Sequence, residues 1–259
     1  MKVSPHSLCW LLAVASVALG QEKDTPAVAP GYHLICATKF QTAIDPAIGQ
    51  QKPTPDSLAI VDAPGRRSGR CLRVTMQQTD DYSKVANGSP RCELSFGRQF
   101  FFAPGKDYLV EWSTFIPADF QFDAPQTEGI TQIHHGLRTG SPPFMLALRG
   151  NHYQVELRGG PKEQIKTIKH PLDNAEADRG HWVKWRLHYS PDAIGAQAIT
   201  RVYKNGALVL DAAREPNAYA GDEKAYLKLG IYKWGWKNQP SDVTSRTLYY
   251  GDVTVAAKD

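Results

Sequence analysis

Residues 182–189 read Trp-Val-Lys-Trp-Arg-Leu-His-Tyr, and this stretch decides the fold class. Apolar and polar side chains alternate along it, with the apolar face formed by Val183, Trp185, Leu187 and Tyr189. Successive side chains of a strand point to opposite faces, so the alternation predicts a β-strand with one face in a core and the other in water or a groove. A helix would instead need apolar residues three and four positions apart.

The same period of two recurs along the chain between turn-forming residues. Asn205-Gly206 separates two apolar runs and predicts a two-residue hairpin. Further strands are predicted at 71–76, 91–96, 108–112, 130–135, 144–149, 153–158, 226–232 and 247–255. The sequence shows no long amphipathic helix and no internal repeat. Many short strands with Gly, Pro, Asn and Asp between them predict an all-β fold, an antiparallel two-sheet β-sandwich.

The N-terminal residues have the features of an export signal. Lys2 gives a short basic start, the run 8–19 is almost entirely apolar, and small residues close it. That run is shorter than the roughly 20 apolar residues of a membrane span, and no later stretch approaches that length. We therefore predict a signal peptide at 1–20, a flexible lead-in at 21–30 and one β-sandwich domain at 31–259. The mature protein is expected to be secreted or periplasmic and not membrane-bound.

Charge and cysteine content narrow the range of partners. The chain carries 30 Lys+Arg against 26 Asp+Glu, and this net charge of +4 is compatible with an acidic substrate but does not predict nucleic-acid binding. Outside the signal, the cysteines are Cys36, Cys71 and Cys92. In an oxidising compartment we expect one disulfide and one buried thiol among them. The chain contains no Cys-x-x-Cys or His-x-x-x-His spacing, so the sequence does not predict a zinc site.

Three predicted strands carry polar residues on the face opposite their apolar residues. These polar residues are Arg91 and Glu93 in the first strand, Gln132 and His134 in the second, and Tyr226, Lys228 and Tyr232 in the third. Gly230 is expected to leave open space between the side chains of the third strand. If the three strands are neighbours, their polar side chains converge on one concave surface.

Three motifs in order, Arg-x-Glu-Leu at 91–94, Gln-Ile-His at 132–134 and Tyr-x-Lys-x-Gly-x-Tyr at 226–232, resemble the signature strands of the jelly-roll polysaccharide lyases. These enzymes include family 7 alginate lyases, family 13 heparin lyases and family 20 glucuronan lyases. The resemblance spans most of the chain after the lead-in. The third motif departs from the Lys-Ala-Gly-x-Tyr-x-Gln form typical of alginate lyases, and Trp234 and Trp236 follow it. The resemblance therefore favours the glucuronan lyases.

The resemblance implies a concanavalin-like jelly roll that cleaves a uronate-containing polysaccharide, with β-1,4-glucuronan as the best match, by β-elimination. Gln132 and Arg91 would hold the uronate carboxylate and stabilise the enolate-like intermediate. Tyr232 would remove the C5 proton and protonate the departing O4, which lie on one face of glucuronate and mannuronate. Lys228 or Arg91 would lower its pKa. His134 would either act as a base for epimers with the opposite geometry or help neutralise the carboxylate.

Further side chains are candidates for contact with the substrate: Lys228, Glu93, Tyr226, His135, Arg138, Arg158 and Trp234. Each also has a structural interpretation. Glu93 can be an ion-pair partner that orients Arg91, Lys228 can be a solvated charge, and the aromatic residues can pack rather than stack on a sugar. The chemistry requires no cofactor, a structural calcium ion is compatible with the sequence, and we expect a monomer.

Other functions are compatible with the same fold. An alginate lyase is the nearest alternative. A glycoside hydrolase needs two carboxylates about 5 to 10 Å apart, but a Glu-x-Asp-x-x-Glu signature is absent, and Glu111, Glu128 and Glu156 are isolated along the chain. A non-catalytic carbohydrate-binding sandwich could use the same aromatic and cationic residues, although the Tyr, His, Gln and Arg set is richer in proton-transfer groups than binding requires.

Overall fold

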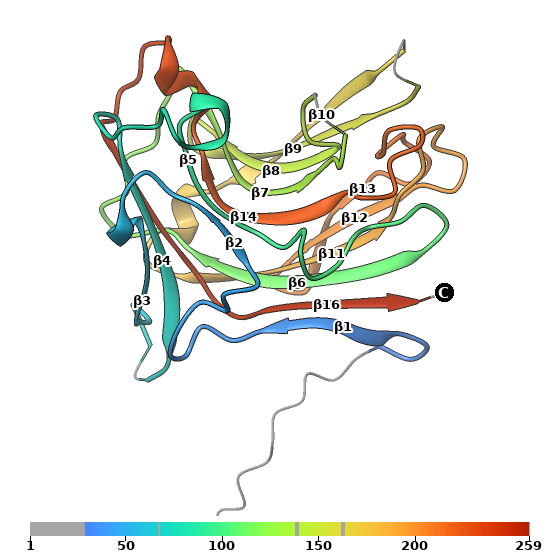
Figure 1. Cartoon of the computed structure of the whole chain (residues 1–259), viewed down its shortest axis with the longest axis horizontal. Coiled ribbons are helices and arrows are strands. Elements are labelled where there is room, and N and C mark those ends of the chain that lie inside the picture. Colours follow the sequence, from blue (N-terminus) through green and yellow to red (C-terminus); the bar gives the residue numbers. More distant parts are fainter. Residues whose placement is uncertain (1–28, 67, 138–139, 162–163, 259) are drawn as a thin grey trace, which may run out of the picture.

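The computed structural model describes residues 29–66, 68–137, 140–161 and 164–258, which form two antiparallel sheets packed face to face (Figure 1). The expected signal peptide and most of the lead-in lie outside these residues. Sheet A contains β13 (Ala207–Asp211), β12 (Ile199–Lys204), β11 (Trp182–Ser190), β6 (Asp107–Phe115), β15 (Ser245–Tyr250), β4 (Arg70–Gln77) and β3 (Leu58–Asp62) in this order, with β16 (Val253–Lys258) also paired with β6 and β1 (His33–Thr38) paired with β16.

Sheet B contains β10 (Lys166–Asn174), β9 (His152–Gly159), β8 (Phe144–Arg149), β7 (Thr127–His134), β14 (Tyr226–Tyr232), β5 (Arg91–Ser95) and β2 (Gly49–Gln51) in this order. Figure 1 shows it above sheet A. The predicted all-β, two-sheet architecture is confirmed.

Helical structure in the described residues is limited to 3-10 turns: η1 (Pro55–Ser57), η2 (Ala86–Gly88), η3 (Glu176–Asp178) and η4 (Trp234–Lys237). In this part of the chain, none of the helices has the length and apolar character needed to cross a membrane.

The core lies between the two sheets and confirms the alternation predicted for β11. Its four apolar side chains are 0–2% exposed. Trp185 packs edge-to-face against Tyr153 of β9, with ring centroids 5.0 Å apart, and so joins sheet A to sheet B. Its Nε1 donates a hydrogen bond to Oγ1 of Thr114 at 2.9 Å. Full burial of a large apolar side chain contributes roughly 1.5–3 kcal/mol, so such contacts hold the sheets together.

The single strand predicted at 247–255 is wrong, because the chain makes two strands there. β15 and β16 pair one after the other with β6. Between them, the backbone N–H of Gly251 donates to the carbonyl oxygen of Ser113 at 3.0 Å. Buried positions accordingly change parity, from Leu248 and Tyr250 to Val253 and Val255.

The expected disulfide is also wrong, since the three cysteines of the described chain are free and buried. Cys36 and Cys71 lie on β1 and β4 of sheet A, whereas Cys92 lies on β5 of sheet B. Each thiol has its own environment: Cys92 Sγ contacts the carbonyl oxygen of Ser57 at 3.4 Å, and Cys36 Sγ contacts Oε1 of Gln99 at 3.2 Å. Burial raises the pKa of all three, that of Cys71 to about 11.

Two irregularities in sheet B set the directions of side chains on β7 and β14. The pairing of β7 with β8 shifts by one residue around Ile130, and the pairing of β7 with β14 shifts in the segment that contains Gly230. The hydroxyl of Tyr250, fully buried on β15, lies 2.7 Å from the carbonyl oxygen of Ile130 and 3.0 Å from that of Gly230. One side chain of sheet A therefore contacts the backbone at both irregularities.

Gly230 does not leave the open space expected from the sequence. Its φ is +141°, and a Cβ at this position would collide with the carbonyl oxygen of Cys92 on the neighbouring strand β5. Only glycine allows both this backbone conformation and this close approach of two strands. The expectation was wrong because the absent side chain is replaced by backbone of β5 rather than by solvent.

Candidate active site

The strands that carry the three motifs, β7, β14 and β5, are neighbours in sheet B. Their register places Lys228 opposite Gln132, Tyr226 opposite His134, and Tyr232 opposite Arg91. Directly paired residues have side chains on the same face of a sheet. The polar residues of the three motifs therefore share the face of sheet B that points away from the core.

Glu93 lies at the centre of a buried group, the Glu93 cluster, formed by Arg91, Glu93, Gln132 and Lys228. One oxygen of the Glu93 carboxylate, Oε1, accepts a hydrogen bond from Nε2 of Gln132, and Oε2 accepts one from Nζ of Lys228. Nη1 of Arg91 lies 3.4 Å from the same Oε2. All four residues are at most 7% exposed, so the carboxylate fixes the orientation of the other three side chains.

The Glu93 cluster retains unused capacity to bind a ligand. Oε1 of Gln132 is buried and has no hydrogen-bond partner among the described residues, and a buried acceptor is costly unless something pairs with it. Two cations face one carboxylate, which leaves an excess of positive charge. Burial lowers the pKa of Lys228 to about 8, although the neighbouring Glu93 acts in the opposite direction.

His134 is held in one tautomer beside this cluster. Its Nδ1 lies 2.8 Å from the carbonyl oxygen of His135, and because a carbonyl only accepts, Nδ1 carries the hydrogen and Nε2 keeps a lone pair. Burial lowers the pKa of His134 to about 4, and the charge of Lys228 contributes to the same shift. At neutral pH the imidazole is therefore uncharged and can accept a proton or a hydrogen bond.

Aromatic and cationic groups surround Tyr232 at the end of β14. The guanidinium carbon of Arg91 lies 4.0 Å from the centre of the Tyr232 ring, and the ring of Trp234, the first residue of η4, has its centroid 5.0 Å from that of Tyr232. Tyr226, at the start of the same strand, has its ring 5.4 Å from that of His134. Burial raises the pKa of Tyr226, and the charge of Glu93 adds to the increase.

These groups open on a pocket of about 520 Å³. The residues predicted from the sequence that line it are Arg91, His134, His135, Tyr226, Lys228 and Tyr232. Gln132 and Glu93 lie in the layer beneath them, where they are 1% exposed. The three motifs thus supply one wall and the floor of a single pocket.

The rest of the pocket wall was not predicted. Gln51 comes from β2, where it lies opposite Glu93, and Asn87 and Ser89 come from the turn that contains η2. Asn87 has φ +64°, and the Asn-Gly dipeptide it begins was an available turn signal. Residues 140–142 complete the wall. A three-residue strand such as β2 is too short to show a period.

The remaining predicted residues fall in different places. His135 is 1% exposed, and its Nε2 donates to the carbonyl oxygen of Gly140 at 2.8 Å. Arg158 lies on β9 and is not among the residues that line the pocket, and Trp234 contacts Tyr232. Trp236 is 7% exposed and packs in the core. Arg138 lies outside the described residues.

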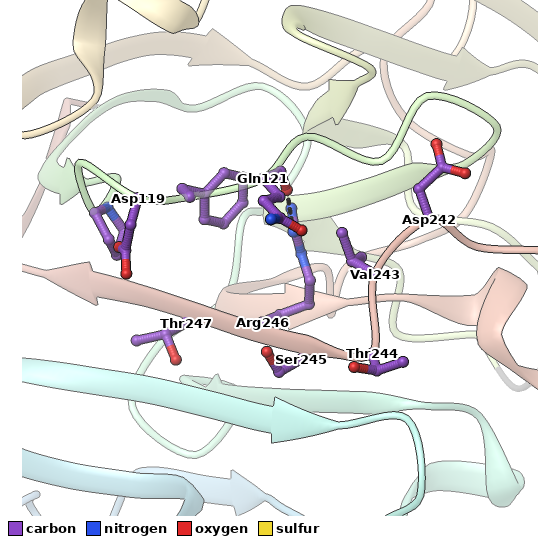
Figure 2. A pocket seen from close by; sticks show the side chains of 10 residues that line it. Asp119, Gln121, Asp242, Val243, Thr244, Ser245, Arg246 and Thr247 are labelled. Carbon is purple, nitrogen blue, oxygen red and sulfur yellow. Dashed lines mark hydrogen bonds between the residues drawn. The ribbon is translucent and has the colours of Figure 1, made fainter.

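A second cavity, of about 370 Å³, is lined by residues 117, 119–121 and 242–247 (Figure 2). Nη1 of Arg246 donates to the backbone oxygen of Gln121 at 2.6 Å beside it. Its described lining contains carboxylates but no histidine, tyrosine or cysteine. Of these two cavities, only the 520 Å³ pocket is lined by histidine and tyrosine side chains.

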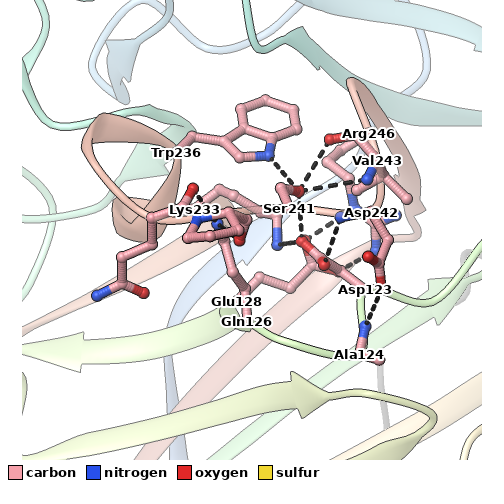
Figure 3. A network of polar contacts seen from close by, with 12 residues as sticks. Asp123, Ala124, Gln126, Glu128, Lys233, Trp236, Ser241, Asp242, Val243 and Arg246 are labelled. Atoms are coloured by element: carbon pink, nitrogen blue, oxygen red, sulfur yellow. Dashed lines mark hydrogen bonds and ion pairs between the residues drawn. The ribbon is translucent and has the colours of Figure 1, made fainter.

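A second buried ion-pair group, the Glu128 network, joins Asp123, Glu128, Lys233 and Arg246 (Figure 3). Nε of Arg246 lies 2.8 Å from Oε2 of Glu128, Nζ of Lys233 lies 3.7 Å from that oxygen, and Lys233 also pairs with Asp123. Arg246 belongs to sheet A and Glu128 to sheet B, so the network lies between the sheets. No group of three or more His, Cys, Asp or Glu side chains in the described chain is arranged to hold a metal ion, and calcium binding stays a prediction.

Comparison with known proteins gives a family and a fold. A family model described as polysaccharide lyase matches residues 38–254. The crystal structure of endo-β-1,4-glucuronan lyase from the fungus Trichoderma reesei matches with a TM-score of 0.69 at 18% identity, over 80% of this chain and 89% of that chain. Alginate lyase A1-II′, a member of polysaccharide lyase family 7, matches with a TM-score of 0.53 at 14% identity, over 80% and 85%.

A second family 7 enzyme, alginate lyase AlgAT5, matches with a TM-score of 0.52 at 16% identity, over 80% of this chain and 84% of that chain. A search of curated proteins gave no match. At these identities the solved structures show a shared fold, which agrees with the jelly roll expected from the three motifs. The family model covers most of the sequence, and the chain therefore belongs to the polysaccharide lyase family.

Proposed function

We propose that the protein is a secreted, monomeric lyase that cleaves β-1,4-glucuronan by β-elimination. The observation that carries this proposal is the pocket in which an uncharged His134 and Tyr232 adjoin the positively charged Glu93 cluster. The better match to the glucuronan lyase than to the two alginate lyases described above supports the choice of polymer. Secretion is inferred from the apolar N-terminal run alone.

The Glu93 cluster suits the carboxylate of the uronate unit whose C5 proton is removed. Gln132 has a second N–H on Nε2 and an unpartnered Oε1, so its amide can pair with a carboxyl group as donor and as acceptor. Arg91 adds a planar cation matched to a carboxylate. These contacts would lower the energy of the enolate-like intermediate, because its charge develops on the carboxyl group.

Tyr232 is our candidate for both proton transfers. Its phenolate oxygen takes the C5 proton, the electron pair forms the C4=C5 double bond, the C4–O4 bond breaks, and the phenol returns the proton to O4. Both sites lie on the same face of a glucuronate unit, so one residue can reach them in turn. Arg91 is stacked on the Tyr232 ring, with its guanidinium carbon 4.0 Å from the ring centre, so a positive charge lies next to the residue that transfers the proton.

His134 is available as an acceptor at neutral pH, because burial holds its pKa near 4. With Nδ1 hydrogen-bonded to a backbone oxygen, only Nε2 is free to act. It can accept a hydrogen bond from a protonated carboxyl group during cleavage of glucuronate. For epimers whose proton and leaving group lie on opposite faces, Nε2 is the better-placed base, and this is the basis of the alginate lyase alternative.

Glycoside hydrolysis is less well supported by the pocket. It requires a pair of carboxyl groups on either side of the bond that breaks. None of the described residues that line the pocket is Asp or Glu. Glu93 lies beneath the pocket with both carboxylate oxygens in hydrogen bonds to the residues around it.

The test is to incubate the protein separately with glucuronan, polymannuronate, polyguluronate, hyaluronan and heparin and to follow ultraviolet absorbance. Elimination leaves a C4=C5 bond conjugated to the carboxylate, which absorbs, whereas hydrolysis leaves none. We expect a signal with glucuronan. Tyr232→Phe should lower kcat by about 10²–10⁴-fold, while Tyr203→Phe, a half-buried tyrosine on β12 of the other sheet, should not change it.

Each result distinguishes the alternatives. A signal confined to polymannuronate or polyguluronate would replace glucuronan with alginate. New reducing ends without absorbance would indicate a hydrolase. Binding of glucuronan with neither product would indicate a carbohydrate-binding protein, and full activity in Tyr232→Phe would remove Tyr232 from the mechanism.

A further inference from the structure

A second charged group lies on the same face of sheet B, on β9 and β10. Glu156, 3% exposed, accepts a hydrogen bond from Nε2 of Gln154 at 2.7 Å and another from Nη2 of Arg158. Nζ of Lys169 lies 3.5 Å from Oε1 of Glu156. We call these four residues the Glu156 cluster; none of them lines the 520 Å³ pocket.

Strand register places the Glu156 cluster in line with the Glu93 cluster. Gln132 lies opposite Met145, Met145 opposite Glu156, and Glu156 opposite Lys169. Neighbouring strands are about 4.8 Å apart, so the row from Gln132 to Glu156 spans about 10 Å on one face of the sheet. A polysaccharide that crosses the strands at the pocket would pass over the Glu156 cluster as it continues.

The charge of the Glu156 cluster is not balanced. Arg158 and Lys169 give two positive charges against the single carboxylate of Glu156, whereas the Glu128 network has two of each sign. Arg158 and Glu156 are largely buried, with side chains 14% and 4% exposed, whereas the side chain of Lys169 is 50% exposed, so the excess positive charge lies at the surface of the cluster. An anionic ligand can reach this charge from the solvent side.

Donors remain available for such a ligand. A guanidinium has five N–H donors, and in the described part of the chain Arg158 uses them toward Glu156 and toward the backbone oxygen of Pro142 at 3.1 Å. Pro142 lines the pocket, so Arg158 borders it. The side chain of Lys169 is 50% exposed and can turn toward a bound anion.

We propose that the Glu156 cluster is a second carboxylate-binding site, which holds another uronate unit of the substrate outside the pocket where the bond breaks. The identity of the ligand rests on the proposed function. Arg158 and Lys169 contact the carboxylate, while Glu156 and Gln154 hold Arg158 in place. Such a site makes binding depend on chain length, because only oligosaccharides that span both clusters gain the second contact.

The first test compares Lys169→Gln with Lys166→Gln, which removes an exposed lysine from the opposite face of the same strand. Lys169→Gln should raise KM for glucuronan by up to about fivefold, the range of a partly exposed ion pair. For the shortest oligosaccharide that is cleaved, KM should not change. Lys166→Gln should leave both values unchanged, and equal KM values for the two variants would overturn the second site.

Arg158→Lys tests the second contact without leaving Glu156 unpaired. A lysine keeps the charge but loses the planar fork of donors. We expect the same dependence on chain length, with a larger rise in KM for the polymer, about tenfold, because a buried charge-assisted hydrogen bond is lost. An unchanged KM on long chains would contradict the role of Arg158.

A binding measurement separates this inference from the proposed chemistry. Tyr232→Phe and Tyr232→Phe/Lys169→Gln are titrated by calorimetry with glucuronan and with the carboxyl-reduced polymer. Weaker binding of glucuronan by the double variant, with no difference for the reduced polymer, supports the second site even if the unmodified enzyme releases no unsaturated product. Equal binding of glucuronan by both proteins overturns the second site and leaves the elimination chemistry intact.

Discussion

The Glu93 cluster and the Glu128 network both contain residues from β7 and from β14 or the position directly after it, but the first faces the pocket and the second lies between the sheets. β7 contributes Gln132 to the Glu93 cluster and Glu128 to the Glu128 network. Lys228 on β14 belongs to the Glu93 cluster, and Lys233, directly after β14, belongs to the Glu128 network. Residues 128 and 132 would share a face in a regular strand. The one-residue shift around Ile130 turns Glu128 toward sheet A, whereas Gln132 faces the pocket.

The Glu93 cluster and the Glu128 network also differ in the balance of their charges and in their hydrogen bonding. In the Glu128 network, two carboxylates face two cations between the sheets (Figure 3). In the Glu93 cluster, one carboxylate faces two cations, and Oε1 of Gln132 lacks a partner among the described residues. Burial of charge by itself therefore does not mark a functional site in this molecule. We therefore base the candidate site on an excess charge next to a pocket.

If the Glu128 network is purely structural, Glu128→Gln should lower the free energy of unfolding by about 3–5 kcal/mol, the cost of breaking a buried ion pair. Arg246, 2% exposed, would lose its carboxylate, and a guanidinium cannot release a proton to avoid the penalty. The kcat of the folded protein should not change. Chemical denaturation and initial-rate kinetics measure the two quantities.

Glu111→Gln is the matched control, because Glu111 pairs with Arg186 at 2.6 Å on an exposed surface. Loss of an exposed ion pair should cost less than about 1 kcal/mol. A loss of kcat in Glu128→Gln that exceeds that of the control would show that the two clusters are not functionally distinct.

The clusters should respond differently to pH because His134 borders only the Glu93 cluster. Its folded pKa is near 4, below the ordinary value near 6.5. Between these values the unfolded chain binds the proton and the folded chain does not, so stability falls as pH drops from about 6.5 to about 4. The full effect is on the order of 3 kcal/mol.

The measurement is the free energy of unfolding at pH 7 and pH 5 for the unmodified protein and for His134→Gln. The variant should lose less stability between the two pH values. His181→Gln, which removes an exposed histidine, should behave like the unmodified protein. An NMR titration midpoint of His134 near 6.5 would contradict the burial argument directly.

Glu93→Gln should mainly lower kcat, whereas Glu128→Gln should mainly lower the free energy of unfolding. Gln132 would lose the carboxylate acceptor that orients its amide, and Lys228 would lose its counter-charge, so we expect kcat to fall about a hundredfold, or about 2.7 kcal/mol. Stability should fall less than in Glu128→Gln, because burial already lowers the pKa of Lys228 to about 8 and the amine can release its proton. A larger loss of stability than in Glu128→Gln, with kcat retained, would reverse the comparison.

The side-chain pattern predicted the parts of the site that depend on local alternation. The faces of β5 and β14 and the half of β7 that carries Gln132 and His134 follow from a period of two. The other half does not, because the shift around Ile130 breaks the period. Glu128, an isolated carboxylate in the sequence, has one cationic partner, Lys233, directly after the neighbouring strand β14, and gains the other, Arg246, only when sheet A packs against it.

Structure that depends on an edge or on a distant partner was also missed. β10 lies at the edge of sheet B, is mostly exposed and contains Pro171, which an edge strand tolerates and a central strand does not. Its pairing with β9 nevertheless brings Lys169 to Glu156. The free cysteines were missed for a related reason: the compartment expected from the sequence favours a disulfide, but the distance between strands of two sheets is a property of the whole fold.

The smallest expected effect concerns the side chain that supports the shift between the two clusters. Tyr250→Phe removes the hydroxyl that contacts the carbonyl oxygens of Ile130 and Gly230, and should lower the free energy of unfolding by about 1–2 kcal/mol. Tyr189→Phe is a matched control. Tyr189 lies on β11 of sheet A, and its fully buried hydroxyl donates to the backbone oxygen of Asn217 at 2.7 Å. Both variants should lose similar stability.

Only Tyr250→Phe should also lower kcat, by about tenfold with KM retained, because the angle between Gln132 and Tyr232 depends on the backbone that Tyr250 holds. Equal kcat values in the two variants would mean that the strands keep their irregular pairing without this hydrogen bond, and the division of β7 between the two clusters would then rest on Gly230 and the close approach of β5.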